Sequence, residues 1–408
     1  MDSIKGIFNN GNDCYINSTL QCLSVSPFII DFINYHKKND EEIINIIKKY
    51  NLGSNKANTI NIEADKLIKL KKNNKLDIPD KDIKYLEYIS KNSYLLYLYL
   101  SFKNIIRNLS NTNTNNNKTL SNKEFIHMNY EIAGFFGYDY LFNGEQNDPH
   151  EFMAYLLDKL HDAKKISKKI SKKISKTSYF DNLDNLDEYS KLYYTSYKST
   201  YENNYSLFVK NLYYYILTAI QCNKCKTISN AVSPSDILCL SIPDDFLKKP
   251  IINNNLTIYN CLNDMFKVEN IQYKCEKCNN YEDNIMEKKI LTKSNTLILK
   301  IKRYHVLSNR TVKNNINIKY PSILNMKSYI VGGNEDISLN YELYGIINHV
   351  GSLNSGHYYS FIKKYNETNN TFYKQWYCCN DSQVTEITKE EALTSQNAYI
   401  LFYNLITK

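Results

Sequence analysis

The sequence has no hydrophobic run that is long enough to cross a membrane. Its longest apolar stretch, from Tyr94 to Phe102, is about half the length of a membrane-spanning helix. The opening residues, MDSIKGIFNN, also lack the apolar core of a secretory signal. We therefore expect an intracellular protein, cytoplasmic or nuclear, that does not bind membranes.

The ten cysteines are not expected to form disulfides, because a chain without a secretory signal stays in a reducing compartment. There, cysteines more often bind a metal or act as catalytic thiols. The excess of positive charge is modest, at +9, and much of it lies in a lysine repeat, KKISKKISKKISK, from Lys164 to Lys176. No aromatic residue interleaves these lysines to stack on bases, so we interpret the repeat as a solvated helix extension or loop and do not expect nucleic-acid binding.

A chain of 408 residues with 43% hydrophobic residues can bury a large core. The first third has mainly helical patterns, interrupted by a polar loop, NTNTNNN, at 111–117. A strong helix start follows at Asp148-Pro149-His150-Glu151. From about Leu207 the pattern changes to strands, namely YYYILTAI, DILCLSI, NTLILKIKRY, YELYGIINHV, HYYSFIKKY and AYILFYNL. Helices followed by strands predict an α+β fold.

One cysteine, Cys14, stands directly after the turn residues Gly11-Asn12-Asp13 and at the start of an apolar pattern that predicts a helix. The first turn of a helix presents unpaired N–H groups and the positive end of the helix dipole, which stabilise an anion. We expect this position to lower the pKa of the Cys14 thiol, which makes the residue a candidate nucleophile. The alternative is an ordinary buried cysteine with a packing role.

Two C-x-x-C pairs have the spacing of a metal site. Each pair lies near the end of an expected strand, and 49 residues separate them, so we expect the two knuckles to come from separate strand pairs. Four thiolates suit a structural, tetrahedral Zn²⁺, whereas a redox dithiol is the alternative. The predicted zinc ligands are Cys222, Cys225, Cys275 and Cys278.

A nucleophilic cysteine needs a histidine and a residue that orients the histidine. His349 and His357 bracket a glycine-containing loop, NHVGSLNSGHYYSF, and His357 begins a strand directly after Gly356. Downstream, the strand QWYCCNDSQV ends in Asn380-Asp381, and either residue could hold an imidazole. These patterns favour His357 over His349, and they leave the choice between the two orienting residues open.

Several separated motifs together resemble the ubiquitin-specific protease family of cysteine deubiquitinases. GIFNNGNDCYINSTLQCL resembles its cysteine box and QNDPHEFMAYLLDKL its second motif. DILCLSIP, the two C-x-x-C knuckles, LILKIKRY and KYP follow in the family's order. YELYGIINHVGSLNSGHYYSFIK and WYCCNDSQV resemble the histidine box, and AYILFY the closing strand. The resemblance runs from Gly6 to Tyr403 and covers nearly the whole chain.

The resemblance implies one catalytic domain over 1–408, with a papain-like cysteine protease fold. A helical thumb with insertions would occupy about 1–205, zinc-ribbon fingers 206–295, and an antiparallel β-sheet palm 296–408. The family grips ubiquitin with the fingers and places the ubiquitin tail between thumb and palm. The implied activity is thiol-dependent hydrolysis at the C-terminal glycine of ubiquitin, by a protein that we expect to be a monomer.

Site residues also follow from the resemblance, position by position. Cys14 would be the nucleophile and His357 the general base. Asn380 matches the third residue of the triad, with Asp381 as the competing neighbour, and Asn9 matches the oxyanion-hole donor. The positions that face the ubiquitin tail in the family are matched by Gln146, Asp148 and Glu151, although helix capping alone would also explain Asp148 and Glu151.

Asp13 departs from the family pattern, which has Thr or Ser before the cysteine, and we expect its negative charge to oppose the thiolate. Two alternatives to a ubiquitin hydrolase remain at this point. One is a protease of the same fold that acts on a ubiquitin-like modifier. The other is a module that binds ubiquitin with little turnover, which the complete set of catalytic residues disfavours.

Overall fold

The computed structural model describes residues 4–53, 57–110, 119–165, 187–202, 204–247, 255–307, 310–331, 339–352 and 356–407. Its contacts divide the chain into two compact units. The first unit takes 1–164, 357–371 and 377–386, and the second takes 165–356, 372–376 and 387–408. The loop expected at 111–117 and the lysine repeat from 166 onward lie outside the described residues.

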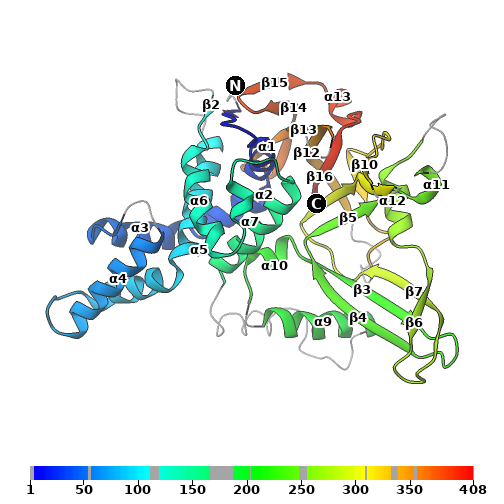
Figure 1. The fold of residues 1–408 in the computed structure, drawn as a ribbon, viewed down its shortest axis with the longest axis horizontal. Coiled ribbons are helices and arrows are strands. Elements are labelled where there is room, and N and C mark those ends of the chain that lie inside the picture. The colour runs from blue at the N-terminus through cyan, green and yellow to red at the C-terminus, as the bar shows by residue number, and fades with distance from the viewer. Residues whose placement is uncertain are drawn as a thin grey trace. The chain divides into compact units, whose positions relative to one another are not determined.

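The first unit is mainly helical, as the sequence predicts (Figure 1). Its helices are α1 (Cys14–Ser24), α2 (Pro27–Tyr35), α3 (Lys37–Lys49), α4 (Ala57–Lys72), α5 (Asp80–Ser110), α6 (Lys123–Phe135), the 3-10 helix η1 (Asp139–Phe142) and α7 (Pro149–Ala163). A short parallel pair joins β1 (Gly6–Ile7) to β2 (Thr119–Leu120). Residues 57–110 contain a long helical pair, α4 against α5.

Helix α1 lies at the centre of the first unit. The pattern of Ile16, Leu20 and Leu23 predicts one buried face, but every residue of α1 is buried. The reason is that α2, α5 and α7 all pack against this helix. Its polar residues are therefore buried too, and they need hydrogen-bond partners inside the protein.

Strand segments complete the first unit. The strands β13 (Gly356–Asn366), β14 (Thr371–Asn380) and β15 (Gln383–Ile387) are neighbours in the order β15-β14-β13. A short turn at 367–370 joins β13 to β14, so the two strands run antiparallel and the start of β13 lies near the end of β14. Asp381 follows β14 in a left-handed conformation, with φ of 51°, and its carbonyl accepts the Ile7 N–H at 2.8 Å.

The second unit contains a four-stranded sheet in the order β4-β3-β7-β6. Its strands are β3 (Tyr214–Gln221), β4 (Ile228–Ser235), β6 (Glu269–Lys274) and β7 (Tyr281–Ile290), and all its pairs are antiparallel. The cysteine knuckles form the turns between β3 and β4 and between β6 and β7. The sequence predicts this placement, because each C-x-x-C follows a strand pattern.

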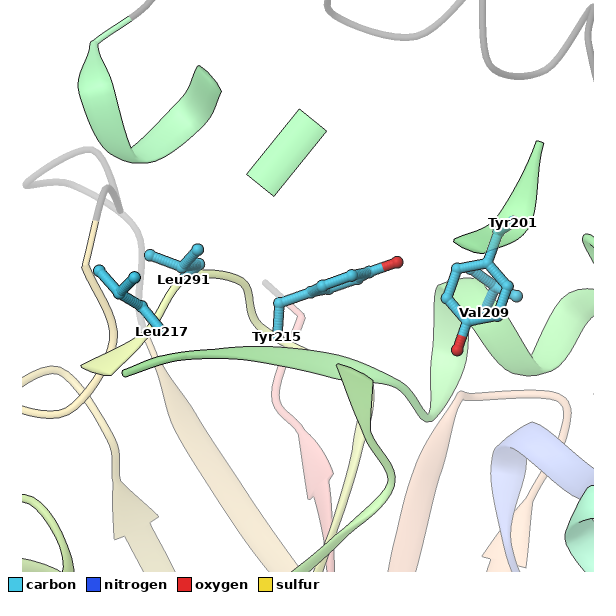
Figure 2. Close-up of a cluster of buried hydrophobic side chains, with 5 residues drawn as sticks. All are labelled: Tyr201, Val209, Tyr215, Leu217 and Leu291. Carbon is cyan, nitrogen blue, oxygen red and sulfur yellow. The ribbon is translucent and has the colours of Figure 1, made fainter. Parts of the chain in front are cut away.

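The helix α9 (Glu188–Tyr201) packs against this sheet through tyrosines that are spaced four residues apart. Tyr189, Tyr193, Tyr197 and Tyr201 pack on a cluster centred on Tyr215 and Leu217 of β3. Figure 2 shows the Tyr215 ring above its strand, with Leu217 and Leu291 on one side and Tyr201 and Val209 on the other. The sequence patterns considered above do not predict this helix, although the tyrosine spacing and the N-cap Asp187 are signals for it.

A second set of strands in this unit has the order β12-β16-β8-β5, with β11 also paired to β12. Its strands are β5 (Ile237–Ser241), β8 (Thr296–Lys302), β11 (Ile323–Asn325), β12 (Asn340–Gly351) and β16 (Ala398–Leu405). The expected antiparallel arrangement holds for β11-β12, β12-β16 and β16-β8, but β5 pairs with β8 in parallel. The remaining elements are α10 (Leu207–Asn211), α11 (Asp244–Leu247), α12 (Ile258–Met265), β9 (Tyr304–Leu307), β10 (Arg310–Lys313) and α13 (Lys389–Leu393).

Among the described residues, no single helix has the length and apolar character of a membrane span. The pair α1 and α2 reaches that length and composition only across a bend of 76°.

Candidate active site and metal site

Cys14 is the first residue of α1 and is 2% exposed. The chain reaches it through a turn in which Gly11 and Asn12 both have positive φ, at 124° and 60°. The Asn9 side-chain oxygen accepts the backbone N–H groups of Gly11 and Asp13, at 3.0 and 3.1 Å. The turn residues that the sequence singles out thus hold the thiol at the beginning of the helix.

His357 lies near the start of β13 and is within reach of Cys14. Its Nε2–H donates to Oδ1 of Asn380, the last residue of β14, at 2.6 Å. The hydrogen bond to Cys14 is the largest cause that raises the pKa of His357, to about 9, and burial opposes it. Since Nε2 is used by Asn380, Nδ1 is the nitrogen that can exchange a proton with the sulfur.

Asp381 lies farther from the imidazole than Asn380 does. Its Oδ2 is 3.9 Å from His357 Nε2. Instead, its two carboxylate oxygens accept hydrogen bonds from side-chain amides, Oδ2 from Asn9 at 2.9 Å and Oδ1 from Asn17 at 2.8 Å. The structure thus gives the two neighbours different contacts: Asn380 touches the histidine, and Asp381 holds the amides beside Cys14.

The carboxylate of Asp13 accepts hydrogen bonds from Asn10. Its Oδ2 accepts the backbone N–H of Asn10 at 3.0 Å and the Asn10 side-chain amide at 3.4 Å. Asp13 stands at the N-cap of α1, but its side chain makes no capping hydrogen bond to the helix. Its charge is therefore directed to the preceding loop.

The three residues expected to face the ubiquitin tail lie at the start of α7. Asp148 is the N-cap of this helix, and its side chain accepts the N–H of His150 at 2.8 Å. Glu151 follows in the first turn and is exposed. Burial is the main cause that raises the pKa of the nearby Tyr140 phenol, and the charge of Glu151 adds to it. Gln146 precedes the cap and is exposed.

His349, the alternative base, lies in the second unit and is 2% exposed. Its Nδ1 is 3.0 Å from the Tyr304 hydroxyl, and its ring lies so close to Gly356 that a Cβ there would collide with Nε2. This histidine packs against the glycine that precedes His357. Its position indicates a structural role.

The four predicted zinc ligands come together in the second unit. Their sulfur atoms all lie within 4.8 Å of one another, with 3.7 Å between Cys222 and Cys278 and 3.6 Å between Cys225 and Cys275. Sulfurs at the corners of a tetrahedron around Zn²⁺, with Zn–S bonds of about 2.3 Å, would be about 3.8 Å apart. All four are free thiols, so the cluster could hold a metal ion.

The two knuckles have the same backbone. In each, the residue after the second cysteine has a left-handed conformation, Lys226 with φ of 59° and Asn279 with φ of 53°. In each, the N–H of that residue also donates to the carbonyl of the first cysteine, at 2.9 and 2.8 Å. Two equivalent turns facing one another are the arrangement that a four-sulfur site requires.

Comparisons with known proteins identify the family of the chain. A family model described as ubiquitin carboxyl-terminal hydrolase matches residues 5–403. The chain belongs to this family.

The relatives carry the same name. Ubiquitin carboxyl-terminal hydrolase 8 of Saccharomyces cerevisiae is 26% identical, and the match covers 99% of this chain and 71% of the yeast protein. A probable ubiquitin carboxyl-terminal hydrolase of Acanthamoeba polyphaga mimivirus is also 26% identical, over 98% of this chain and 90% of the viral protein. As a member of the family, the protein is a cysteine-type deubiquitinase, as the motifs predict.

Solved structures show the same fold. The SAGA DUB module of Ubp8, Sgf11, Sus1 and Sgf73 bound to monoubiquitin matches with a TM-score of 0.63 and 22% identity, over 100% of this chain and 70% of the other. The module bound to ubiquitin aldehyde matches with a TM-score of 0.62 and the same identity and coverage. The predicted ubiquitin-specific protease fold is therefore confirmed.

Proposed function

We propose that this deubiquitinase cleaves the bond after the C-terminal glycine of ubiquitin with Cys14 as its nucleophile. The Cys14 thiolate attacks the glycine carbonyl, and the C–N bond to the lysine amine breaks as the tetrahedral intermediate collapses. Protonated His357 gives its proton to the departing amine. His357 then takes a proton from water, which attacks the thioester and releases ubiquitin and the thiolate.

Asn380 orients the imidazole in this reaction. Its Oδ1 accepts the Nε2–H at 2.6 Å, which fixes the tautomer and turns Nδ1 toward the sulfur. An amide adds no full charge, so its contribution is mainly geometric. The raised pKa of His357 favours the imidazolium that the leaving amine needs.

Asn9 supplies the oxyanion hole in this proposal. Its side-chain amide has two N–H groups, and Asp381 accepts one of them at 2.9 Å. The second N–H can donate to the oxyanion, together with the unpaired backbone N–H groups at the start of α1. Because Asn9 is held through both its oxygen and its nitrogen, the donor is oriented before substrate arrives.

Asp148 and Glu151, together with Gln146, would bind the ubiquitin tail. The arginine side chains and free N–H groups of an extended tail suit carboxylates and amides. Asp148 also caps α7 through the His150 N–H, so we infer that capping and substrate contact are both functions of this residue.

The cysteine cluster would hold one structural Zn²⁺. Four sulfur ligands complete the coordination shell and leave no position for a catalytic water, so this metal would fix the two knuckles rather than take part in hydrolysis.

The observation that supports this function best is that Cys14, near the start of the sequence, meets His357 and Asn380, near its end, in one unit. A module that only binds ubiquitin would not need this arrangement. The same geometry would also serve a ubiquitin-like modifier, which remains the second candidate substrate.

The test is hydrolysis of a fluorogenic C-terminal amide of ubiquitin by the wild type, Cys14→Ala and Cys22→Ala. Cys22 lies in the same helix and is 0% exposed, so it is a matched control for the loss of a buried thiol. We expect Cys14→Ala to lose all turnover and Cys22→Ala to retain it. Turnover by Cys14→Ala would show that another residue is the nucleophile.

A further inference from the structure

A buried asparagine outside all the recognised motifs connects to the candidate oxyanion hole. Asn122 directly precedes α6 and is 0% exposed. Its Oδ1 accepts from the Asn10 amide at 2.5 Å, and its Nδ2 donates to Asn17 Oδ1 at 2.8 Å. Resting on the function proposed above, we propose that Asn122 is a positioning residue for the hydrolysis, acting through Asn17, Asp381 and Asn9.

The hydrogen bonds form a directed chain whose polarity is set by a carboxylate. Asp381 can only accept, so Asn17 must present its Nδ2 to Asp381, at 2.8 Å, and its Oδ1 toward Asn122. Asn122 must then donate with Nδ2, which leaves its Oδ1 to accept from Asn10. Each amide therefore has one orientation, and reversing any of them would set two donors or two acceptors against each other.

This chain of hydrogen bonds ends at Asn9, the residue that we propose as the oxyanion donor. Asp381 uses its second oxygen, Oδ2, to accept the Asn9 amide at 2.9 Å. Asn122 thus acts on Asn9 through two intermediates, and it lies 112 residues from Asn10 and 105 from Asn17 in the sequence. No other described hydrogen bond of Asn17 Oδ1 is available to replace this one.

Loss of the Asn122 side chain would leave the Asn17 oxygen without a donor in a buried helix. Asn17 is 2% exposed, so this oxygen would be unsatisfied, while its Nδ2 keeps two acceptors, Asp381 Oδ1 at 2.8 Å and the Phe8 carbonyl at 3.3 Å. The Asn17 amide would then be held from one side only, so the Asp381 carboxylate and the Asn9 amide that donates to it would be positioned less firmly. The consequence is a less ordered oxyanion donor, while Cys14 and His357 keep their own contact.

The experiment compares Asn122→Ala with Asn129→Ala. Asn129 belongs to the same segment, is also 0% exposed and also makes two side-chain hydrogen bonds, which it donates to Ser101 Oγ and the Phe125 carbonyl. We expect both variants to lose similar thermal stability. We expect only Asn122→Ala to lower kcat on the fluorogenic ubiquitin amide, by about tenfold with KM within twofold, less than the 100- to 1000-fold loss of a direct oxyanion donor.

Alkylation of Cys14 by iodoacetamide separates this role from damage to the thiol. That reaction passes through no oxyanion, so its rate should stay within twofold of the wild type in Asn122→Ala. In the Asn9→Ala background, adding Asn122→Ala should lower kcat no further, because both changes act on the same donor. If Asn122→Ala is unfolded at the assay temperature, Asn122→Ser is measured by the same criteria.

The proposal is overturned if wild-type turnover is normal and the Asn122 variant matches the Asn129 variant in kcat. It is also overturned if Asn122→Ala lowers kcat further in the Asn9→Ala background, or if Asn122→Ala lowers the alkylation rate as much as it lowers kcat. A wild type that does not hydrolyse the ubiquitin substrate contradicts the proposed function instead, and this result is visible before any variant is compared.

Discussion

At the residue scale, the contacts of Asn380 and Asp381 separate two roles that the sequence left open. Asn380 is 2.6 Å from His357 Nε2, whereas Asp381 is 3.9 Å away and accepts from Asn9 and Asn17. We predict that Asn380→Ala lowers kcat by about tenfold to a thousandfold, as expected for a general base that loses its orientation. Asn380→Asp should be tolerated, because a carboxylate can accept the same hydrogen bond.

Asp381→Ala should lower kcat less than Asn380→Ala does, and it should act through Asn9 rather than through His357. The measurement is turnover of both alanine variants on the same substrate. If Asn380→Ala keeps nearly normal turnover while Asp381→Ala is inactive, Asp381 and not Asn380 orients His357.

His357 has a pKa of about 9, above the 6.5 of an ordinary histidine, and its hydrogen bond to Cys14 is the largest cause. A raised pKa means that folding favours the protonated ring. The stability that this provides is complete below about pH 6.5 and is lost as the pH rises through 9. We predict that Cys14→Ala shifts the pKa of His357 down toward 6.5, measured by NMR titration of the ring.

The matching stability experiment uses His357→Gln. The free energy of unfolding of the wild type should exceed that of the variant most below pH 6.5, and the difference should shrink between pH 6.5 and 9. A difference that grows over this interval would contradict the sign of the shift.

Cys14 could be predicted because the residues that position it are adjacent in sequence. Asn122 could not, because its partners are far away in sequence. The turn and the helix start around Cys14 are adjacent in sequence, so Gly11, Asn12 and Asp13 are sufficient to predict the position of the thiol. Asn122 meets Asn10 and Asn17 only because the chain folds back over more than a hundred residues. A single buried asparagine in a polar stretch has no pattern that marks it.

At the scale of elements, the two knuckles and their strands account for the cysteine cluster. We predict one zinc ion per chain in protein purified without chelators, measured by elemental analysis. Cys278→Ser should lower the melting temperature and the affinity for ubiquitin more than it lowers kcat, because the metal fixes the knuckles and is not part of the chemistry. Cys239→Ser, outside the cluster in β5, is the control.

Purified protein without zinc would contradict the metal assignment. A Cys278→Ser variant with wild-type stability and affinity would show that the knuckles do not depend on a metal.

Element types were predictable where a periodic pattern was strong. The helix after Asp148 and the main strands from β3 to β16 appear where the sequence places them. The sequence did not predict the burial of α1 on all sides or the parallel pairing of β5 with β8, because both depend on which elements pack together. It also missed α9, whose buried side is made of tyrosines rather than aliphatic residues.

At the scale of the whole molecule, family membership rests on motifs spread over 5–403 and on a fold shared with Ubp8. The boundaries near 205 and 295, the monomeric state and the cellular compartment stay predictions. The choice between ubiquitin and a ubiquitin-like modifier depends on a large surface of the folded substrate. Cys14 and its neighbours contact only the end of the tail in the proposed reaction, so they do not decide this choice.

The most direct test of the central claim is the reaction of the wild type with ubiquitin that has an electrophile in place of its C-terminal glycine, analysed by intact mass. We predict one covalent adduct on the wild type, located at Cys14 by peptide mapping, and none on Cys14→Ala. The matching probes built on ubiquitin-like modifiers should react much more slowly. An adduct on a different cysteine, or a faster reaction with a ubiquitin-like probe, would contradict the account.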